Sequence, residues 1–387
     1  MTRVLQISNY QYPHIGGIEQ VARDIADALL ENDEIEQKMI CFNEDAQDGD
    51  YICHRRETVY DKVDGFDVIR CGCIAKVASQ SLSTTYNREL KKIFNEFKPN
   101  LVIFHYPNPF VAHFLLKYKK QDFKLALYWH LDITKQKSIK KFFHGQNLAL
   151  IDRADYILGA TPIHLNESEF SEYFGEKKYV LPYMIDEKKL VLTEEEKQAA
   201  ENIRKKHQDE KIGFFIGRHV PYKGLKYLVE ASSKLSDTKI HFYIAGQGEL
   251  TEELKKQAQD DPKIEFIGRI SDSQRRIYQQ ACDIVCFPSI TRNEAFGLAL
   301  AEGMYFGKPA VTFHIDGSGV NYVNLDRVTG IECPNCDSDA YAEAINKLCK
   351  DDKLREEYGR NARQRVLENF TVDRFKENVN IFINSLN

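Results

Sequence analysis

The densest group of residues with chemical potential lies between residues 293 and 309. Glu294 follows an apolar, strand-like run, and a helix pattern begins near Phe296. The backbone N–H groups of Phe296, Gly297 and Leu298 have no intrahelical partner at such a helix start. They would therefore suit a phosphate or a sugar hydroxyl.

Two carboxylates belong to the same segment. Glu294 can accept hydrogen bonds from sugar hydroxyls, and Glu302, about two turns further along, could accept one from a ribose. Glutamates eight positions apart also recur by chance in an acidic chain, and Glu294 could simply be a charge favoured by the helix macrodipole. The spacing alone leaves both interpretations open.

A cation pair follows the first strand-like run of the second half. Arg218 and Lys223 flank a turn with glycines at Gly217 and Gly224. Fixed cations at a strand's carboxyl end can neutralise the charge that develops on a departing phosphate. The alternative is two solvated surface cations, but the position and the glycines favour a diphosphate site.

Two further strand ends in the first half carry candidate ligand contacts. Gly16 and Gly17 precede a helix pattern and would permit close backbone approach to a phosphate, although they could form only a tight turn. They do not form the G-x-G-x-x-G pattern of a dinucleotide site. A lone histidine is usually structural, but His130 follows the only tryptophan, Trp129, and stands at a strand end, which also allows a ligand contact.

Strand-like runs that alternate with helix patterns are the elements that would position these residues. The predicted strands are Val4–Ser8, Lys38–Phe42, Val68–Cys71, Leu101–His105, Leu125–His130, Tyr156–Gly159, Phe214–Gly217, Ile240–Ala245, Ile264–Gly268, Ile284–Phe287 and Ala310–Phe313. This alternation predicts an α/β fold of two doubly wound, Rossmann-like domains with parallel sheets. Ligands of such sheets bind beyond the carboxyl ends of the strands, so two facing sheets would hold a ligand between the domains.

In this order, the motifs resemble those of the retaining glycosyltransferases of family 4, which have the GT-B fold. The resemblance covers essentially the whole chain, and its motifs are Gly16-Gly17, His130, Arg218 to Lys223, Gly246-x-Gly248, Phe266-x-Gly268 and Glu294 to Glu302. It implies that two Rossmann-like domains face each other across a cleft. The expected domains are residues 1–185 on the acceptor side and 186–370 for the nucleotide sugar. A final helix within 371–387 would cross back to the first domain.

The resemblance also implies a role for each site residue. Among the catalytic residues, Glu294 would bind hydroxyls of the donor sugar, Arg218 and Lys223 would stabilise the leaving diphosphate, and His130 would lie near the reactive face of the sugar. The implied binding residues are Gly16 and Gly17 over the phosphate, Phe296, Gly297 and Leu298 as backbone donors, Glu302 on the ribose, and Arg269 and Ile270 beside the nucleobase.

The implied activity is retaining transfer of a hexosyl group from a nucleotide sugar, GDP-mannose or a UDP-hexose, to a sugar hydroxyl of a glycan. One segment departs from the family pattern: Gly317-Ser318-Gly319 stands where many relatives carry a Pro-Glu pair. This version is similar to a subgroup of bacterial surface-polysaccharide transferases. The alternatives are another GT-B activity, such as a sugar-nucleotide epimerase or a phosphorylase, and a non-catalytic, two-domain sugar-binding protein.

Neither a cofactor nor a metal is expected, because Arg218 and Lys223 can do the work of a cation. Asp48-Gly49-Asp50 and Asp337-Ser338-Asp339 match a metal-binding D-x-D pattern, but chance explains both better. The pairs Cys71/Cys73 and Cys333/Cys336 could supply thiolates for zinc, yet two reduced pairs from different domains are the preferred interpretation.

Charge and hydropathy limit the classes of partner that the protein can have and the cellular location that we expect. The net charge of −5 argues against a nucleic-acid partner, and no run of about 18 apolar residues predicts a membrane span. The N-terminus has no long apolar signal-peptide core, so we expect a cytoplasmic protein and not an exported sugar receptor.

Residues 86–150 hold twelve basic and four acidic side chains, a balance of +8. This basic face could lie on the inner, anionic face of the cell membrane beside a lipid-linked acceptor, or it could be solvated helix surface. Nine of the twelve basic residues fall on or beside predicted helices together with Phe94, Phe97, Phe142 and Phe143: Lys91, Lys92, Lys117, Lys119, Lys120, Lys135, Lys137, Lys140 and Lys141.

Overall fold

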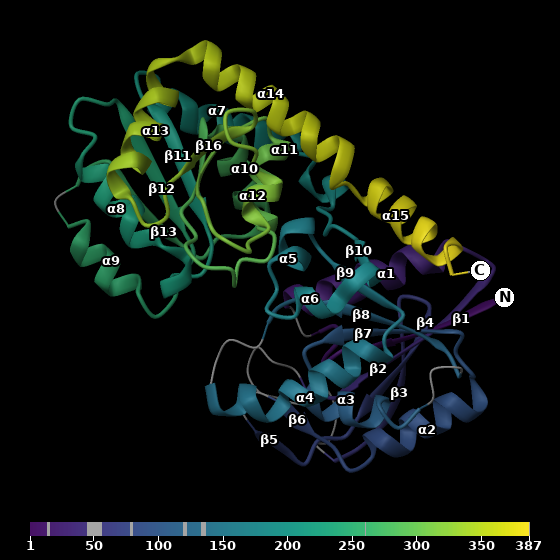
Figure 1. Cartoon of the computed structure of the whole chain (residues 1–387). Helices are drawn as coiled ribbons and strands as arrows, with labels where there is room; N and C mark the ends of the chain where they lie inside the picture. The colour runs from purple at the N-terminus through teal and green to yellow at the C-terminus, as the bar shows by residue number, and fades with distance from the viewer. Residues whose placement is uncertain are drawn as a thin grey trace. The chain divides into compact units, whose positions relative to one another are not determined.

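A computed structural model describes residues 1–13, 16–44, 56–77, 80–118, 122–132, 137–259 and 261–386, with the backbone alone for residues 77 and 137–142 (Figure 1). The chain divides into two compact units. The N-terminal unit holds residues 1–160, 165–181 and 375–387, and the C-terminal unit holds residues 161–164 and 182–374. Each unit has a main sheet of predominantly parallel strands, which confirms the predicted α/β fold class.

The N-terminal unit is built on an eight-stranded sheet of order β10-β9-β8-β7-β1-β2-β4-β3, parallel except for β3. Its strands are β1 Thr2–Ile7, β2 Ile35–Phe42, β3 Val59–Val63, β4 Phe66–Cys71, β7 Leu101–Tyr106, β8 Lys124–Trp129, β9 Tyr156–Gly159 and β10 Lys178–Val180. A separate hairpin pairs β5 Ala75–Val77 with β6 Gln80–Leu82. All six residues of β7 are buried, as expected of a parallel strand covered on both faces.

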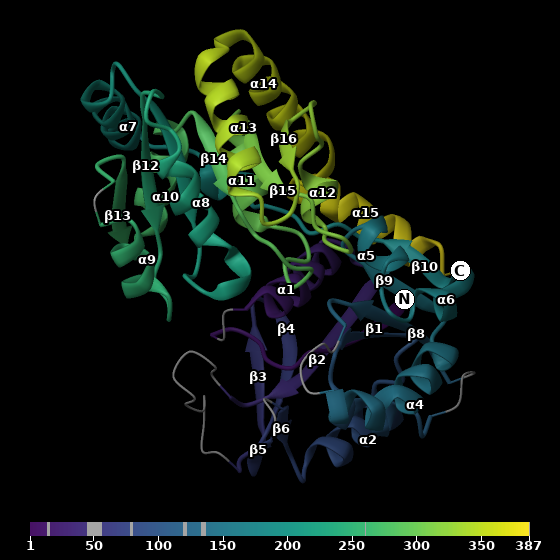
Figure 2. The same ribbon diagram turned by 60° about the vertical axis from the view of Figure 1, so that its left-hand side comes forward.

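Helices cover both faces of this sheet (Figure 1 and Figure 2). On one face, Ala22 and Ala26 of α1 pack against Met39 and Val68. The other face carries α2, α3 and α4 over a larger cluster that includes Leu5, Phe104 and Leu127. The helices of the unit are α1 Gly17–Leu30, α2 Tyr86–Glu96, α3 Pro109–Leu115, α4 Lys137–Arg153 and α6 Ser171–Phe174.

The last helix, α15 Val372–Asn384, returns the chain to the N-terminal unit. The ring of Phe382 lies 5.3 Å from that of Tyr156 and 5.0 Å from that of Tyr179, measured between centroids. Lys376 forms an ion pair with Glu31 at the end of α1 at 2.5 Å. The helix lies within residues 371–387, where the sequence predicts it.

The C-terminal unit is built on a six-stranded, fully parallel sheet of order β13-β12-β11-β14-β15-β16. Its strands are β11 Lys211–Ile216, β12 Ile240–Ala245, β13 Ile264–Gly268, β14 Ile284–Phe287, β15 Ala310–Phe313 and β16 Gly330–Cys333. The strand order reverses between β11 and β14. In open α/β sheets this reversal point is where ligands bind, just outside the carboxyl ends of the strands.

The helices α8, α9 and α13 lie on one face of this sheet, while α7, α10 and α11 lie on the other (Figure 1). Capping boxes start α7 at Thr193 and α10 at Ser271 and fix where these helices begin. The helices are α5 Pro162–Asn166, which spans both units, α7 Glu194–Lys206, α8 Leu225–Ser233, α9 Thr251–Gln257, α10 Asp272–Ala281, α11 Leu298–Tyr305, α12 Val320–Val323, α13 Ser338–Lys350 and α14 Asp352–Asn369.

A buried carboxylate secures the segment that follows β8. Asp132 accepts hydrogen bonds from Trp129 Nε1 at 2.8 Å, Ser168 Oγ at 2.7 Å and the backbone N–H of Glu169 at 3.0 Å. The Trp129 ring is fully buried and stacks on Tyr106 at 3.9 Å between centroids. Trp129 is therefore part of the core, and its indole N–H is hydrogen-bonded to Asp132.

We expect Asp132→Ala to lower the free energy of unfolding by about 3 kcal/mol, because it leaves buried donors unsatisfied at about 1–3 kcal/mol each. Urea unfolding followed by tryptophan fluorescence measures this change, since Trp129 is the only tryptophan and reports on the N-terminal unit. The exposed Asp33→Ala is the control and should stay within about 0.5 kcal/mol of wild type. Equal midpoints for both variants would show that Asp132 has no such role.

Candidate active site

Hydrogen bonds between loops hold together the carboxyl ends of β13, β12 and β11. The backbone N–H of Gly246 donates to the carbonyl of Gly268 at 2.7 Å, and that of His219 donates to the carbonyl of Gln247 at 3.2 Å. A Cβ on Gly246 would lie 1.9 Å from the carbonyl oxygen of Gly217, so only glycine permits this approach. The loops that carry Arg218 and Gly246-x-Gly248 therefore form one surface.

An ion pair joins the next loop to this surface. Lys223 ends the short 3₁₀ turn Pro221–Lys223 after β11, and its ammonium contacts Oε2 of Glu294 after β14. Ser289 Oγ donates to the same oxygen at 3.1 Å. The side chains of Lys223 and Glu294 are only 12% and 13% exposed, so their charges are weakly screened. The sequence predicts both residues for the site but not their contact.

The Gly317-Ser318-Gly319 segment lies directly against the Glu294 loop. Ser318 Oγ donates to the backbone carbonyl of Glu294 at 2.5 Å. A Cβ on Gly319 would stand 2.0 Å from the carbonyl oxygen of Ala295. This segment, noted in the sequence only as a departure from the family pattern, thus supports the backbone that carries Glu294.

The start of α11 differs from the sequence-based expectation. The helix begins at Leu298 and not at Phe296, because Gly297 takes φ +91° and the ring of Phe296 is buried against Tyr183 and Phe370. The backbone N–H groups of Phe296, Gly297 and Leu298 donate no hydrogen bond to any residue that the structure describes. They remain a set of donors beside Glu294, as the pattern predicts.

The remaining C-terminal candidates lie around this centre. Arg218 is exposed and forms no ion pair within the described part of the chain, so its charge is available to an anion. Arg269 is exposed after β13, and Ile270 is half-buried against the Phe214 cluster. Among the described residues, the arrangement offers an unpaired cation, Arg218, at the end of β11 and an apolar side chain, Ile270, at the end of β13.

Glu302 lies on α11 and contacts α10. Its carboxylate is 3.4 Å from Nη1 of Arg275 and accepts a hydrogen bond from Nε2 of Gln279 at 3.4 Å. Burial raises the pKa of Glu302, although the Arg275 guanidinium opposes that shift. No contact links Glu302 to Lys223 or Glu294 in the described residues, so the two carboxylates form separate parts of the site.

The other predicted site residues, Gly16, Gly17 and His130, belong to the N-terminal unit. Gly16 is the N-cap of α1, and no described atom lies within 4 Å of a Cβ built on Gly17. His130 is 2% exposed at the end of β8, and its Nε2 lies 3.0 Å from Nδ1 of His105. His105 and its further partner Gln6 are absent from the sequence prediction, although a polar residue within an apolar strand is a visible signal in both cases.

The metal-like motifs have other partners or lie outside the described residues. Asp48-Gly49-Asp50 lies outside them. Asp337 caps α13 and accepts hydrogen bonds from the backbone N–H groups of Asp339 and Ala340. Burial raises the pKa of the Cys333 thiol to about 12 and that of Cys71 well above its ordinary value, so both are poor thiolate donors.

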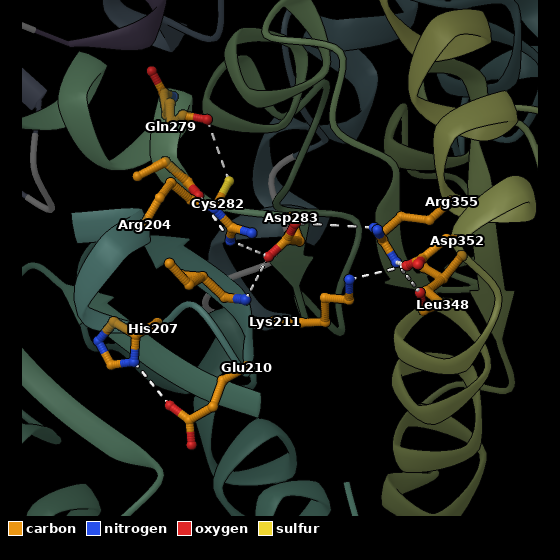
Figure 3. Close-up of polar contacts among 12 residues, drawn as sticks. Arg204, His207, Glu210, Lys211, Gln279, Cys282, Asp283, Leu348, Asp352 and Arg355 are labelled. Carbon is orange, nitrogen blue, oxygen red and sulfur yellow. Dashed lines mark hydrogen bonds and ion pairs between the residues drawn. The ribbon is translucent and has the colours of Figure 1, made fainter. Parts of the chain in front are cut away.

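Among the described residues, one group of three could offer ligand atoms to a metal: His207, Glu210 and His241. Figure 3 shows the contact between His207 and Glu210. His207 Nδ1 is 2.8 Å from Glu210 Oε2, and its Nε2 is 2.9 Å from Tyr243 Oη. The two imidazole rings are stacked at 26°, whereas a shared metal would have to lie in both ring planes. His207 and Glu210 also precede β11, at the edge of the sheet opposite the candidate site.

Some cations predicted for the basic face are exposed, but two of its predicted aromatic residues pack in the core. Lys91, Lys92 and Lys117 are exposed. Phe97 is buried, and the Phe94 ring packs on Tyr118 and Phe123 within the core. The predicted residues Lys119, Lys120 and Lys135, and the side chains of Lys137, Lys140, Lys141 and Phe142, lie outside the described residues. None of the described helices is both long enough and apolar enough to cross a bilayer.

Comparisons with known proteins bear on the whole chain. Residues 196–365 match the family model described as Glycosyl transferases group 1. The chain is 28% identical over 378 residues to the O-antigen chain mannosyltransferase C of Escherichia coli, covering 96% of this chain and 95% of the relative. It is 30% identical over 308 residues to the D-rhamnosyltransferase WbpZ of Pseudomonas aeruginosa, covering 77% of each.

Two solved structures share the fold along their full length. A sucrose-phosphate synthase from Thermosynechococcus elongatus superposes with a TM-score of 0.76 at 17% identity, covering 100% of this chain and 99% of that chain. Anabaena Alr3699/HepE in complex with UDP and glucose superposes with a TM-score of 0.72 at 17% identity, covering 100% of both chains. At such identities these likenesses bear on the fold alone.

The raised pKa of Glu302 predicts how stability depends on pH. A carboxyl with a higher pKa in the native state than its ordinary 4.5 destabilises the fold when ionised. We therefore expect Glu302→Gln to be more stable than wild type at neutral pH. This advantage should disappear as the pH falls through the native pKa towards 4.5, because wild-type Glu302 is then protonated in both states.

Chemical unfolding at several pH values between 4 and 8 measures the difference. The control is Glu356→Gln, exposed on α14, which should change stability by no more than about 0.5 kcal/mol at each pH. A Glu302→Gln difference that stays constant over this range would contradict the expected linkage.

Proposed function

Because the chain belongs to the group 1 glycosyltransferase family, also called family 4, and has the GT-B fold, we propose that it transfers a hexosyl group from a nucleoside-diphosphate sugar to a hydroxyl of a bacterial surface glycan, with retention of configuration. The observation that carries the proposal is the position of Arg218, Lys223 and Glu294 at one edge of a parallel sheet, beside backbone N–H groups that donate no hydrogen bond within the described part of the chain. Such an edge suits an anionic diphosphate attached to a polyhydroxyl group.

The charges indicate which side chain would meet the diphosphate and which would meet the sugar. Arg218 has no partner in the described residues and can meet the diphosphate, whereas the charge of Lys223 is balanced by Glu294. A diphosphate beside Lys223 would share the ammonium with that carboxylate. Glu294 is then left with oxygens that can accept hydrogen bonds from sugar hydroxyls, which is the role proposed for it.

We assign no covalent role to Glu294, because its Oε2 already contacts both Lys223 and Ser289. In the proposed reaction the bond between the anomeric carbon and the diphosphate oxygen breaks, and the acceptor oxygen bonds to the same face of that carbon. The acceptor's proton leaves to the departing diphosphate. Arg218 and Lys223 would stabilise the negative charge that develops there.

The donor is proposed as GDP-mannose or a UDP-hexose. The name of one relative specifies mannosyl transfer, and a structural neighbour was solved with UDP and glucose. Ile270 and the backbone after β13 are the part of the site proposed to meet the nucleobase. A wider guanine and a smaller uracil would fill that region differently.

Thermal melting against UDP-, GDP- and dTDP-sugars and the free diphosphates tests the proposal. A ligand at a hundred times its dissociation constant stabilises the native state by about 2.7 kcal/mol, so one nucleotide family should raise the melting temperature clearly. Lys223→Ala and Arg218→Ala should each lose most of that shift. Arg218→Ala is the more informative variant, because the exposed Arg218 side chain has no partner among the described residues. Its removal therefore leaves none of these residues without an ion-pair partner.

Lys226→Ala is the matched control, since Lys226 is an exposed cation on α8 that lies over the Tyr227 ring. It should keep the full ligand-dependent shift. Absence of a shift with every nucleotide would leave the family membership intact but contradict donor binding at this edge, and would favour another GT-B activity or a non-catalytic role.

We also propose that the acceptor is linked to a lipid at an anionic membrane surface, on the support of the +8 charge balance of residues 86–150. Each cation near such a surface contributes about 1 kcal/mol. Liposomes with anionic lipid should therefore retain the protein at low salt and release it at high salt. Charge reversal at Lys137, Lys140 and Lys141 should reduce retention, whereas no retention at low salt would rule the proposal out.

A further inference from the structure

One side chain of α12 holds the loop of residues 314–319 that follows β15. Asn321 Oδ1 accepts a hydrogen bond from the backbone N–H of Ile315 at 3.0 Å. Its Nδ2 donates to the carbonyl of Phe313 at 3.3 Å and to Oε2 of Glu332 on β16. Because a backbone N–H only donates and these oxygens only accept, the partners fix the orientation of the amide. Asn321 therefore ties the start of the loop to β16.

The partners of Asn321 are themselves fixed. Oε1 of Glu332 lies 2.5 Å from Nδ1 of His314, so both carboxylate oxygens of Glu332 are in use. At the other end of α12, the guanidinium of Arg365 on α14 donates to the carbonyls of Tyr322 and Val323. The short helix that carries Asn321 is thus attached to both β16 and α14.

The held loop reaches the backbone of Glu294. The backbone N–H of Ser318 donates to the carbonyl of Ile315 at 3.1 Å, and Ser318 is fully buried. Its Oγ donates to the carbonyl of Glu294 at 2.5 Å. Three hydrogen bonds in succession, through Ile315 and Ser318, therefore lead from Asn321 to Glu294.

The carboxylate of Glu294 is fixed separately from its backbone. Its Oε2 contacts the ammonium of Lys223 and accepts a hydrogen bond from Ser289 Oγ at 3.1 Å. Its Oε1 accepts no hydrogen bond from the residues that the structure describes. With the backbone and Oε2 both held, the position of Oε1 is determined, and this oxygen is left to accept from a ligand.

We propose that Asn321 and Ser318 are positioning residues that set where Glu294 Oε1 meets a hydroxyl of the donor sugar, and that they thereby control affinity for the sugar part of the donor. The inference rests on the proposed function, which assigns the sugar to Glu294. Arg218, proposed to meet the diphosphate, has no hydrogen bond to either positioning residue in the described part of the chain. Loss of Asn321 or Ser318 should therefore weaken binding of the sugar more than binding of the diphosphate.

Isothermal titration calorimetry with two ligand pairs, UDP-glucose with UDP and GDP-mannose with GDP, measures this difference. The sugar ratio is the dissociation constant of the diphosphate divided by that of its nucleotide sugar. In the pair that wild type binds, Ser318→Ala and Asn321→Ala should each lower the sugar ratio by about 10-fold, as expected for the loss of a hydrogen bond within a buried network. An unchanged sugar ratio in both variants would overturn the proposal, because a purely structural loss weakens both ligands equally.

An exchange of donor and acceptor tests the orientation of the Asn321 amide. Asn321→Asp keeps an oxygen for the N–H of Ile315 but places a carboxylate against Glu332, so its sugar ratio should fall as in Asn321→Ala. Adding Glu332→Gln supplies an amide N–H for the new carboxylate and should recover most of the loss. A double variant no better than Asn321→Asp would contradict the assigned role of Asn321.

The matched control is Thr238→Val. Thr238 is buried before β12, at the opposite edge of the sheet, and its Oγ1 donates to Asn346 Oδ1 at 2.7 Å. The control therefore loses a buried hydrogen bond far along the sheet from Glu294, and it should keep the wild-type sugar ratio. A fall as large as that of Ser318→Ala would show that general loss of stability, and not positioning, sets the ratio.

Amide hydrogen exchange without ligand separates failure of this inference from failure of the proposed function. Residues 291–301 should exchange faster in Ser318→Ala and Asn321→Ala than in wild type, whereas β12 should not change. Unchanged exchange in residues 291–301 would show that these contacts do not fix the loop, and the inference fails. If exchange changes as expected but wild type binds neither ligand pair, the proposed function fails and the role in sugar binding fails with it. If wild type binds a pair and the sugar ratio is unchanged in the variants, only the positioning role fails.

Discussion

Parallel pairing of all six strands is the constraint on which the C-terminal unit depends. It sends every carboxyl end to one edge of the sheet, so loops far apart in the sequence meet there. The loops that carry Lys223 and Glu294 follow β11 and β14, between which the strand order reverses. The ion pair between the two side chains holds these loops together. Glycines elsewhere on this edge have no side chain to keep neighbouring loops apart, so the backbone at Gly246 lies directly against that of Gly217.

Burial of polar groups has two different effects in this chain. At the edge of the C-terminal sheet, opposite charges are placed together with little exposure, so an incoming anion can exchange one partner for another. On β7 of the N-terminal unit, burial instead lowers the pKa of His105 to about 3, so that this imidazole is neutral at physiological pH. The first pair holds charge that an anion can redistribute, whereas His105 is a neutral hydrogen-bonding group.

The sequence predicts those parts of the fold that local pattern determines. The strands Ile284–Phe287 and Ala310–Phe313 have the predicted bounds, because apolar runs of this length belong in a sheet covered on both faces. The strand Val59–Val63 is not predicted, since it carries Asp61 and Lys62 and owes its conformation to antiparallel pairing with β4. Likewise, Lys223 and Glu294 stand out by type and position. Their contact spans 71 positions and depends on which strands become neighbours, and no local pattern contains that information.

The return of α15 to the N-terminal unit has a consequence for biosynthesis. Phe382 and Lys376 complete the surface formed by Tyr156, Tyr179 and Glu31, yet residues 182–374 of the other unit are translated between them. At 5–20 residues per second the ribosome needs roughly 10 to 40 s for that stretch. During this interval the nascent N-terminal unit presents uncovered aromatic rings, and the C-terminal unit can fold as a whole before the first one is finished. The unit that begins synthesis first is thus the last to be completed.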